Sequence, residues 1–268
     1  MTVNITSQLQ PTLTQITIYP VKSLDGITVD SVQISDGGAL TFDRHWAIVD
    51  DRGKVVNAKR TAKIQQLRSQ FDLGLGLIRL QTPDENTTHT FSLNTELAEL
   101  AGWLSQFFEF PVSIIENAVN GFPDDLDAYG PTIISTATLE TICAWFPDLN
   151  LAEVRRRFRT NLELRGVPAF WEDRLFTLPG AAVDFQLGDV RFHGINPCQR
   201  CPVPTRDSFT GVVTPNFQKT FVQQRQKELP DWVNPARFNH FYRLAVNTQI
   251  PLSEAGKFLN TGDCFLDL

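Results

Sequence analysis

The first third of the chain is a series of short strand-like runs separated by turn residues, and this pattern constrains the fold more than any other feature. Apolar and polar residues alternate in ITIYPVKS, ITVDSVQIS and AIVDDRGKVV, which is typical of half-buried antiparallel strands. Asp36-Gly37-Gly38 and Asp51-Arg52-Gly53 provide turn chemistry. The alternation continues in LIRLQT and THTFSLN, on either side of a polar turn at 83–86. These runs predict a small β domain.

The rest of the chain adds a few helices and then returns to strands. Helical spacing of apolar residues predicts helices over 95–108 and 135–146, and one or two short helices within 216–243. The segment GFPDDLDAYGP at 121–131 is predicted to be a surface loop between domains. LELRG, VDFQLGDVRFHGI and GDCFLDL read as strands. The predicted fold class is mostly β (α+β), with domains at 1–120 and 121–268, a division that the length of 268 residues allows.

Charge and apolar patterning exclude several functions. The net charge of -6 argues against general binding to nucleic acid or to anionic membranes, because both require a cationic face. The N-terminus does not resemble a secretory signal, and no segment reaches the ~20 apolar residues of a membrane span. A cytoplasmic location is therefore expected. There the four cysteines would remain thiols.

Cys198-Gln-Arg-Cys201 is the one cysteine motif, and several interpretations of it stay open. A thioredoxin-like pair needs a helix N-terminus, which Pro202 and Pro204 disfavour. A zinc site needs more ligands than this pair, and Cys143 and Cys264 lie far away in sequence. Two buried structural thiols are a third possibility. A soft thiolate near cations also suits molybdenum on a pterin, a metal that brings most of its own ligands.

At this point the chain resembles the MOSC family, named for the molybdenum cofactor sulfurase C-terminal domain, and within it the amidoxime-reducing proteins. The resemblance covers nearly the whole chain. It rests on several short motifs in the family's order: Tyr19-Pro20-Val21-Lys22-Ser23, Phe42-Asp43-Arg44-His45-Trp46, Arg157-Phe158-Arg159-Thr160-Asn161, Trp171-Glu172-Asp173, Leu187-Gly188-Asp189 and Cys198-Gln199-Arg200-Cys201. It implies an N-terminal MOSC β-barrel domain followed by a C-terminal MOSC β-barrel domain.

The resemblance also implies a set of site residues for the molybdenum cofactor (Mo-molybdopterin). Cys201 matches the cysteine that ligates molybdenum, and Asp207 matches an acidic position of the following loop that could move protons. The plain alternative for Asp207 is a turn-forming residue before Thr210-Gly211. The candidates for cofactor contact are Lys22, Ser23, Arg44, Ser135, Thr136, Thr138, Arg159, Asn161, Arg200 and Cys201 itself. The chain departs from the family at Thr160, where relatives have proline, and in the loop after Cys201, which contains Pro202, Pro204 and Arg206.

The function implied is an oxidoreductase that reduces small N-oxygenated substrates, such as hydroxylamines and amidoximes. The chain ends without the ferredoxin-like domain that some bacterial relatives append, so electrons are expected from a separate ferredoxin, flavoprotein or cytochrome. An alternative function is a carrier of sulfur or of molybdenum cofactor on Cys201 without reductase activity. A third is a β-barrel protein that has lost the cofactor.

Overall fold

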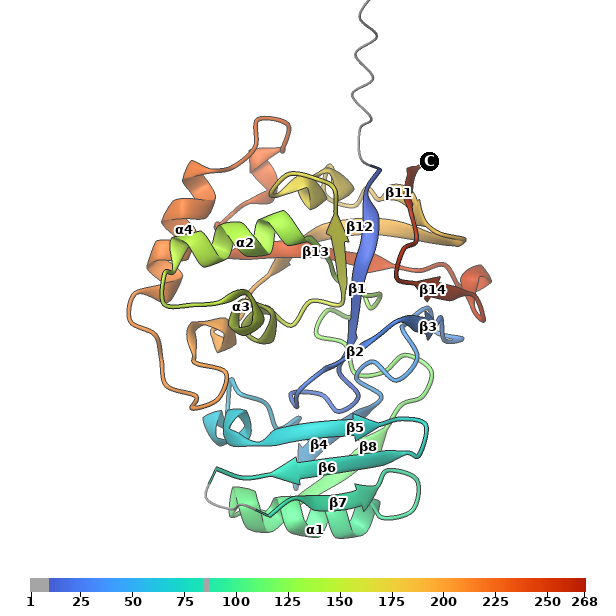
Figure 1. The fold of residues 1–268 in the computed structure, drawn as a ribbon, viewed down its shortest axis with the longest axis vertical. Coiled ribbons are helices and arrows are strands. Elements are labelled where there is room, and N and C mark those ends of the chain that lie inside the picture. The colour runs from blue at the N-terminus through green and yellow to red at the C-terminus, as the bar shows by residue number, and fades with distance from the viewer. Residues whose placement is uncertain (1–9, 84–86) are drawn as a thin grey trace, which may run out of the picture.

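An eight-stranded sheet forms the centre of the computed structural model, which describes residues 10–83 and 87–268 (Figure 1). The residues that bear on a secretory signal begin before this range, and residues 84–86 of the predicted polar turn also lie outside it. In spatial order the strands are β15 (Phe265–Asp267), β11 (Val183–Leu187), β12 (Val190–Gln199), β13 (Arg243–Gln249), β9 (Ile133–Ser135), β10 (Leu162–Arg165), β1 (Thr12–Ile18) and β2 (Ile27–Val29).

Smaller sheets form the lower part of the molecule in Figure 1. One pairs β4 (Trp46–Asp50) with β8 (Val112–Glu116), and another joins β5 (Arg68–Asp72), β6 (Leu77–Gln81) and β7 (His89–Ser92). Helix α1 (Leu97–Phe108) packs beside them and buries Leu100, Leu104 and Phe108. The predicted turns are confirmed, since Gly38 and Gly53 both have positive φ.

The N-terminal strands belong to the central sheet rather than to the lower part. β1 pairs antiparallel with β10, which lies about 150 residues further along the chain, and β3 (Ser31–Gln33) pairs with β14 (Phe258–Asn260). Leu13, Ile16 and Ile18 are accordingly buried in one core with strands of the C-terminal half. The sheet therefore crosses the domain boundary predicted at 120/121, and that boundary stays a prediction.

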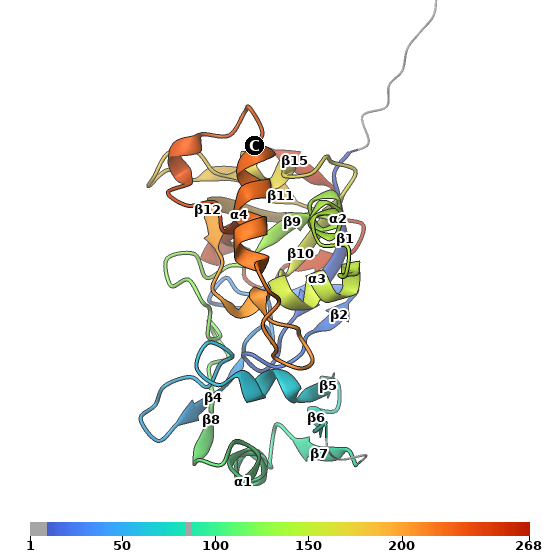
Figure 2. The same cartoon turned by 90° about the vertical axis from the view of Figure 1, so that its left-hand side faces the viewer.

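Three helices lie together at one side of the central sheet, where Figures 1 and 2 both place them. They are α2 (Thr136–Trp145), α3 (Leu151–Phe158) and α4 (Phe217–Lys227). A core of Leu139, Val154, Phe158 and Phe221 fills the space between them. Short 3₁₀ turns complete the chain at Ala62–Gln66, Trp171–Leu175, Val203–Thr205, Pro235–Arg237 and Leu252–Glu254.

The predicted fold class is confirmed: the protein is mostly β with a few packed helices. The sequence patterns missed α3 and the strands β5, β8, β9, β13 and β14. Within the described residues, the longest helices are too short or too polar to cross a bilayer.

Candidate cofactor-binding site

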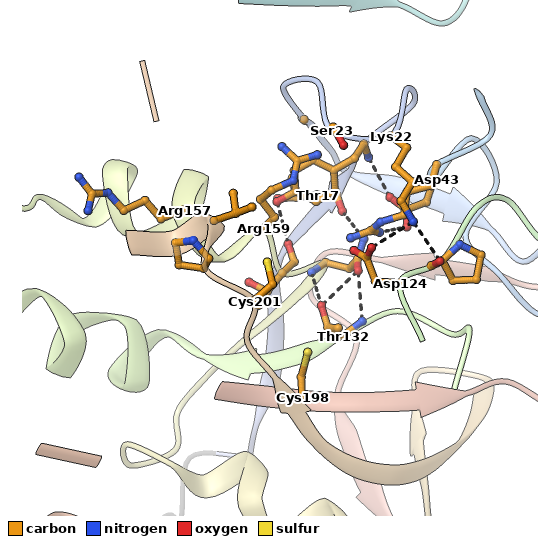
Figure 3. A pocket seen from close by; sticks show the side chains of 18 of the residues that line it. Thr17, Lys22, Ser23, Asp43, Asp124, Thr132, Arg157, Arg159, Cys198 and Cys201 are labelled. Carbon is orange, nitrogen blue, oxygen red and sulfur yellow. Dashed lines mark hydrogen bonds and ion pairs between the residues drawn. The ribbon is translucent and has the colours of Figure 1, made fainter. Parts of the chain in front are cut away.

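A cavity of about 870 Å³ opens where the central sheet meets the lower part of the molecule. Its walls come from β1 and the turn after it, the 121–130 segment, α3, and the end of β12. Figure 3 shows Lys22, Ser23, Arg159 and Cys201 pointing into this space. Seven of the predicted site residues line it: Lys22, Ser23, Arg44, Arg159, Asn161, Arg200 and Cys201.

The cavity is cationic although the chain is acidic. Ten of its lining residues are Lys or Arg and five are Asp or Glu, whereas the whole chain has a net charge of -6. Clustered guanidinium and ammonium groups bind phosphate and carboxylate through charge-assisted hydrogen bonds. The cavity is therefore suited to an anionic ligand.

Lys22 is held at one edge of the cavity by the segment that the sequence predicted to be a surface loop. Its Nζ donates to the carbonyls of Phe122 at 2.8 Å and Pro123 at 3.0 Å, and pairs with Asp124 at 3.0 Å. Burial lowers the pKa of Lys22, and Asp124 partly offsets this effect. For Asp124, the nearby Lys22 and Arg44 outweigh burial and lower its pKa to about 2. The carboxylate is thus charged at any physiological pH.

Three lining residues adopt left-handed backbone conformations that side chains rarely take. The φ angles are 76° at Ser23, 51° at Arg44 and 52° at Arg159. A non-glycine residue in this region costs on the order of 1 kcal/mol or more and persists only where the surroundings hold it. All three were predicted cofactor contacts from sequence, so the strain coincides with the candidate site.

Arg159 owes its position to α3. Asn150 caps this helix, because its side chain accepts a hydrogen bond from the Glu153 N–H at 2.9 Å. Arg155 is fixed by two bonds to Glu163, at 2.7 and 2.8 Å, and Arg157 pairs with Glu153 at 2.7 Å. The helix ends at Arg159, whose left-handed conformation turns the chain into β10.

Asn161 lines the cavity, but its amide is used within the protein framework. Its Nδ2 donates to the Thr17 carbonyl at 3.0 Å, and its Oδ1 accepts from the backbone N–H and the hydroxyl of Thr132, each at 3.2 Å. It thereby ties β1 to the start of β9. A structural role is established by these contacts, and its predicted contact with a cofactor stays a prediction.

Both cysteines of the motif face the cavity at the end of β12. Arg200 donates from Nη1 to the Cys198 sulfur at 3.2 Å and from Nη2 to the Phe158 carbonyl. Its buried Nε has no hydrogen-bond partner among the described residues, and the same holds for Nε of Arg243. Burial alone would lower the pKa of Arg200, but Cys198 and Cys201 raise it. Unsatisfied donors beside a thiol are what an anionic ligand bound there would pair with.

No group of three or more His, Cys, Asp or Glu side chains suited to a metal ion occurs in the described part of the chain. All four cysteines are free thiols. A zinc site that recruits Cys143 and Cys264 therefore has no basis in the geometry. A metal that brings most of its own ligands needs only one thiolate, and the cavity offers Cys201.

Ser135, Thr136 and Thr138 do not line the cavity, and their predicted contact with a cofactor stays a prediction. Ser135 caps α2, since its Oγ accepts from the Thr138 N–H at 3.1 Å. The Thr138 hydroxyl accepts from the Phe170 N–H at 2.6 Å. Thr136 donates to Glu163 at 2.8 Å. Their hydroxyls are used to hold the helix start against neighbouring segments.

Asp207 also lies outside the cavity lining, and its geometry is that of the plain alternative, a turn residue. Its Oδ1 accepts from the backbone N–H groups of Phe209 at 3.1 Å and Thr210 at 2.8 Å. Although burial pushes the pKa of Asp207 up, these bonds and the nearby Arg157 lower it overall. A carboxylate held in its charged form is a poor proton donor at neutral pH.

Tyr19 and Asp124 are two of the lining residues that were not selected from the sequence. Tyr19 belongs to one of the motifs, but its role as a contact of two arginines is visible only in the structure. Asp124 lies in an acidic, turn-rich segment whose composition indicates a solvent-exposed loop. Sequence composition carries no signal that this loop folds back onto Lys22.

The fold and the site thus define a class of protein: mostly β, with a cationic cavity that exposes a thiol. Comparison with known families identifies part of it: residues 10–111 match the MOSC N-terminal beta barrel domain. This match confirms the resemblance seen in the sequence motifs for the N-terminal part of the chain.

The relatives include molybdenum cofactor sulfurases and an amidoxime-reducing component, all at low identity. Human molybdenum cofactor sulfurase is 22% identical over 246 residues, which cover 74% of this chain and 27% of the sulfurase. The rice sulfurase is 31% identical over 109 residues, covering 40% of this chain and 13% of its own length. Human mitochondrial amidoxime-reducing component 1 is 25% identical over 244 residues, covering 76% of this chain and 68% of its own length. The chain thus spans less than a third of these two sulfurases.

Proposed function

We propose that this protein binds the molybdenum cofactor in its cationic cavity and reduces N-hydroxylated compounds there. One observation carries the proposal: the Cys201 thiol shares a cavity with strained Ser23, Arg44 and Arg159, in a chain whose relatives are molybdenum cofactor proteins. Strain at a site is a hallmark of function when the surrounding fold maintains it.

The residues present fit this cofactor. A volume of about 870 Å³ lies within the range of cavities that hold organic cofactors. Cys201 would ligate the metal, and Lys22, Ser23, Arg44 and Arg159 would bind the phosphate and the polar edges of the pterin. Arg200, whose Nη1 donates to the Cys198 sulfur and whose buried Nε is unpaired among the described residues, offers a further donor. When bound, the cofactor supplies the two-electron redox chemistry.

The protein's own residues would neutralise the charge of the bound cofactor, orient it and protect it. The cations offset the charge of the ligand, and the fixed conformations of Arg44 and Arg159 reduce the entropy lost on binding. Since Asp207 lies outside the lining and holds its charge, protons for the departing water would come from solvent in the cavity. Electrons would come from a separate ferredoxin, flavoprotein or cytochrome.

Turnover with an artificial reductant tests this function. We expect the protein produced in a cofactor-synthesising host to convert benzamidoxime to benzamidine with a reduced viologen dye, and Cys201→Ser to lose this activity. Cys264→Ser is the matched control, because Cys264 is exposed and does not line the cavity. Wild-type protein that contains molybdenum but turns over neither an amidoxime nor a hydroxylamine contradicts the reductase function.

A second function is supported by the contact between Arg200 and Cys198. The Cys198 sulfur accepts a hydrogen bond from the Arg200 guanidinium at 3.2 Å and lines the same cavity as Cys201, so two thiols are available there to a carrier of sulfur or cofactor. Relatives named as molybdenum cofactor sulfurases agree with such a role. Persulfide on either cysteine of the motif, detected by intact-protein mass spectrometry in a preparation free of molybdenum, would favour the carrier.

A further inference from the structure

Arg44 and Arg159 share the ring of one tyrosine. The guanidinium carbon of Arg159 lies 4.1 Å from the centroid of the Tyr19 ring, and that of Arg44 lies 5.2 Å from it. Arg44 follows the turn after β3, whereas Arg159 ends α3, so the two arginines reach this ring from distant parts of the chain. A cation over an aromatic face is attracted by the ring quadrupole, most strongly where water is excluded.

The two guanidiniums repel each other without a ligand. Burial lowers the pKa of Arg159, and the positive charge of Arg44 lowers it further. Arg44 has a counterion in Asp43, but Arg159 takes part in none of the salt bridges found among the described residues. Arg159 therefore has no direct carboxylate partner among these residues, although the more distant Asp25 and Asp124 offset part of its charge, and it remains available to an anion.

Tyr19 is fixed by contacts to both arginine segments. Its backbone N–H donates to the Asp43 carboxylate at 2.8 Å, and its carbonyl accepts from the Arg44 N–H at 2.8 Å. Its hydroxyl donates to the carbonyl of Thr160, the residue after Arg159, at 3.2 Å. Tyr19 thus contacts the segments that carry both arginines.

We propose that Tyr19 is a positioning residue that holds Arg44 and Arg159 at the spacing of a clamp for one phosphate dianion. The clamp rests on the proposed function only for the identity of its ligand. In the proposed function, the phosphate is that of the molybdenum cofactor. Nothing in its geometry depends on molybdenum. The ring face, rather than the hydroxyl, provides the attraction to both guanidiniums.

Binding of inorganic phosphate to the full chain, produced in a host that makes no molybdenum cofactor, tests the clamp. Titration calorimetry should give a Kd that rises at least about tenfold in Tyr19→Leu, because both guanidiniums lose their cation–π contact and a single desolvated contact corresponds to roughly that factor. The conservative variant Tyr19→Phe keeps the ring and should stay within about threefold of wild type, because a neutral hydrogen bond is worth less. Arg159→Met should abolish phosphate binding.

Gly26 provides a test that leaves the ring chemistry intact. A Cβ at Gly26 would lie 2.6 Å from Cε1 and 2.8 Å from Cδ1 of Tyr19, so Gly26→Ala must displace the ring. Phosphate affinity should fall in Gly26→Ala too. If Tyr19→Leu fails to fold, the phosphate affinity of Gly26→Ala tests whether the position of the ring controls binding. Thermal unfolding of each variant identifies such a failure.

Several results would overturn the clamp. The first is a wild-type chain that binds no phosphate. The second is that Tyr19→Leu and Gly26→Ala fold and bind phosphate as tightly as wild type does. The third is that Tyr19→Phe binds phosphate as weakly as Tyr19→Leu. Failure of the proposed function gives a different result: phosphate binding follows the variants as expected, yet wild-type protein from a cofactor-synthesising host contains no molybdenum.

Discussion

Glu172 is a carboxylic acid in the core of the C-terminal half. It is 1% exposed, and neither of its carboxyl oxygens has a hydrogen-bond partner among the described residues. Burial, followed by the charge of neighbouring Asp173, raises its pKa from the usual 4.5 to about 7. The group is therefore neutral in the folded protein at a pH where it is charged in the unfolded chain.

This difference predicts a pH-dependent stability. As pH rises from about 4.5 to 7, the unfolded state releases the proton and the folded state keeps it, so the free energy of unfolding should fall by about 2–3 kcal/mol from this group. Glu172→Gln cannot titrate and should lack this component. Urea denaturation of both proteins at pH 5 and pH 7.5 measures it. If the difference in the free energy of unfolding between wild type and Glu172→Gln is the same at both pH values, the raised pKa of Glu172 is contradicted.

At this scale the sequence identified seven of the residues that line the cavity. Lys22, Arg44 and Arg159 were recognised because they belong to short motifs. Asp207 and Ser135 were included on the same basis and lie elsewhere, because a motif position does not reveal which local hydrogen bonds a side chain satisfies. Tyr19 was passed over, since a tyrosine near a strand end is usually a core residue.

Among the elements, α2 has Ser135 as its N-cap. Substituting this residue separates an effect on helix capping from an effect on cofactor binding. Ser135→Ala removes the bond to the Thr138 N–H and should lower the free energy of unfolding by about 1 kcal/mol, within the 0.5–2 kcal/mol range of capping losses. Since Ser135 does not line the cavity, molybdenum content should not change. Loss of metal with unchanged stability would instead place Ser135 in the cofactor site.

Helix α3 was missed in the sequence although its signals are present. Asn150 precedes Glu153 by three residues, and Leu151, Val154 and Phe158 follow at helical spacing. Consecutive arginines at 155–157 interrupt these apolar residues, so the apolar stripe is narrow and easily overlooked. The strands β5, β8, β9 and β14 were missed because they are short, and β13 was missed because it is buried along nearly its whole length and so shows no alternation.

The whole molecule is built around a sheet that recruits strands from both ends of the chain. Local periodicity predicted that the first segment is a strand, but it cannot predict that β1 pairs with β10. The mostly β class and the order of the elements were therefore predictable, whereas the interleaving of the two halves was not. The cavity is a product of this interleaving, because residues of β1 and α3 meet in its wall.

A truncation tests how far the two halves depend on each other. A chain of residues 121–268 loses six side chains that are buried in the core of the C-terminal half: Leu13, Ile16, Ile18, Val32, Ile34 and Leu40. At roughly 1.5–3 kcal/mol each, their loss is comparable to the whole stability of about 5–15 kcal/mol of a typical domain. We expect this fragment to lack cooperative thermal unfolding by circular dichroism. A sharp transition would show that the predicted second domain folds alone.

The central claim is that the Cys201 sulfur ligates molybdenum, and metal content tests it most directly. Wild type, Cys201→Ser and Cys264→Ser should be produced in the same cofactor-synthesising host and their molybdenum measured by elemental mass spectrometry. We predict near-equal molybdenum in wild type and Cys264→Ser, and a loss of at least about tenfold in Cys201→Ser, since serine replaces a soft thiolate with a hard hydroxyl. Equal molybdenum in all three proteins would contradict the account.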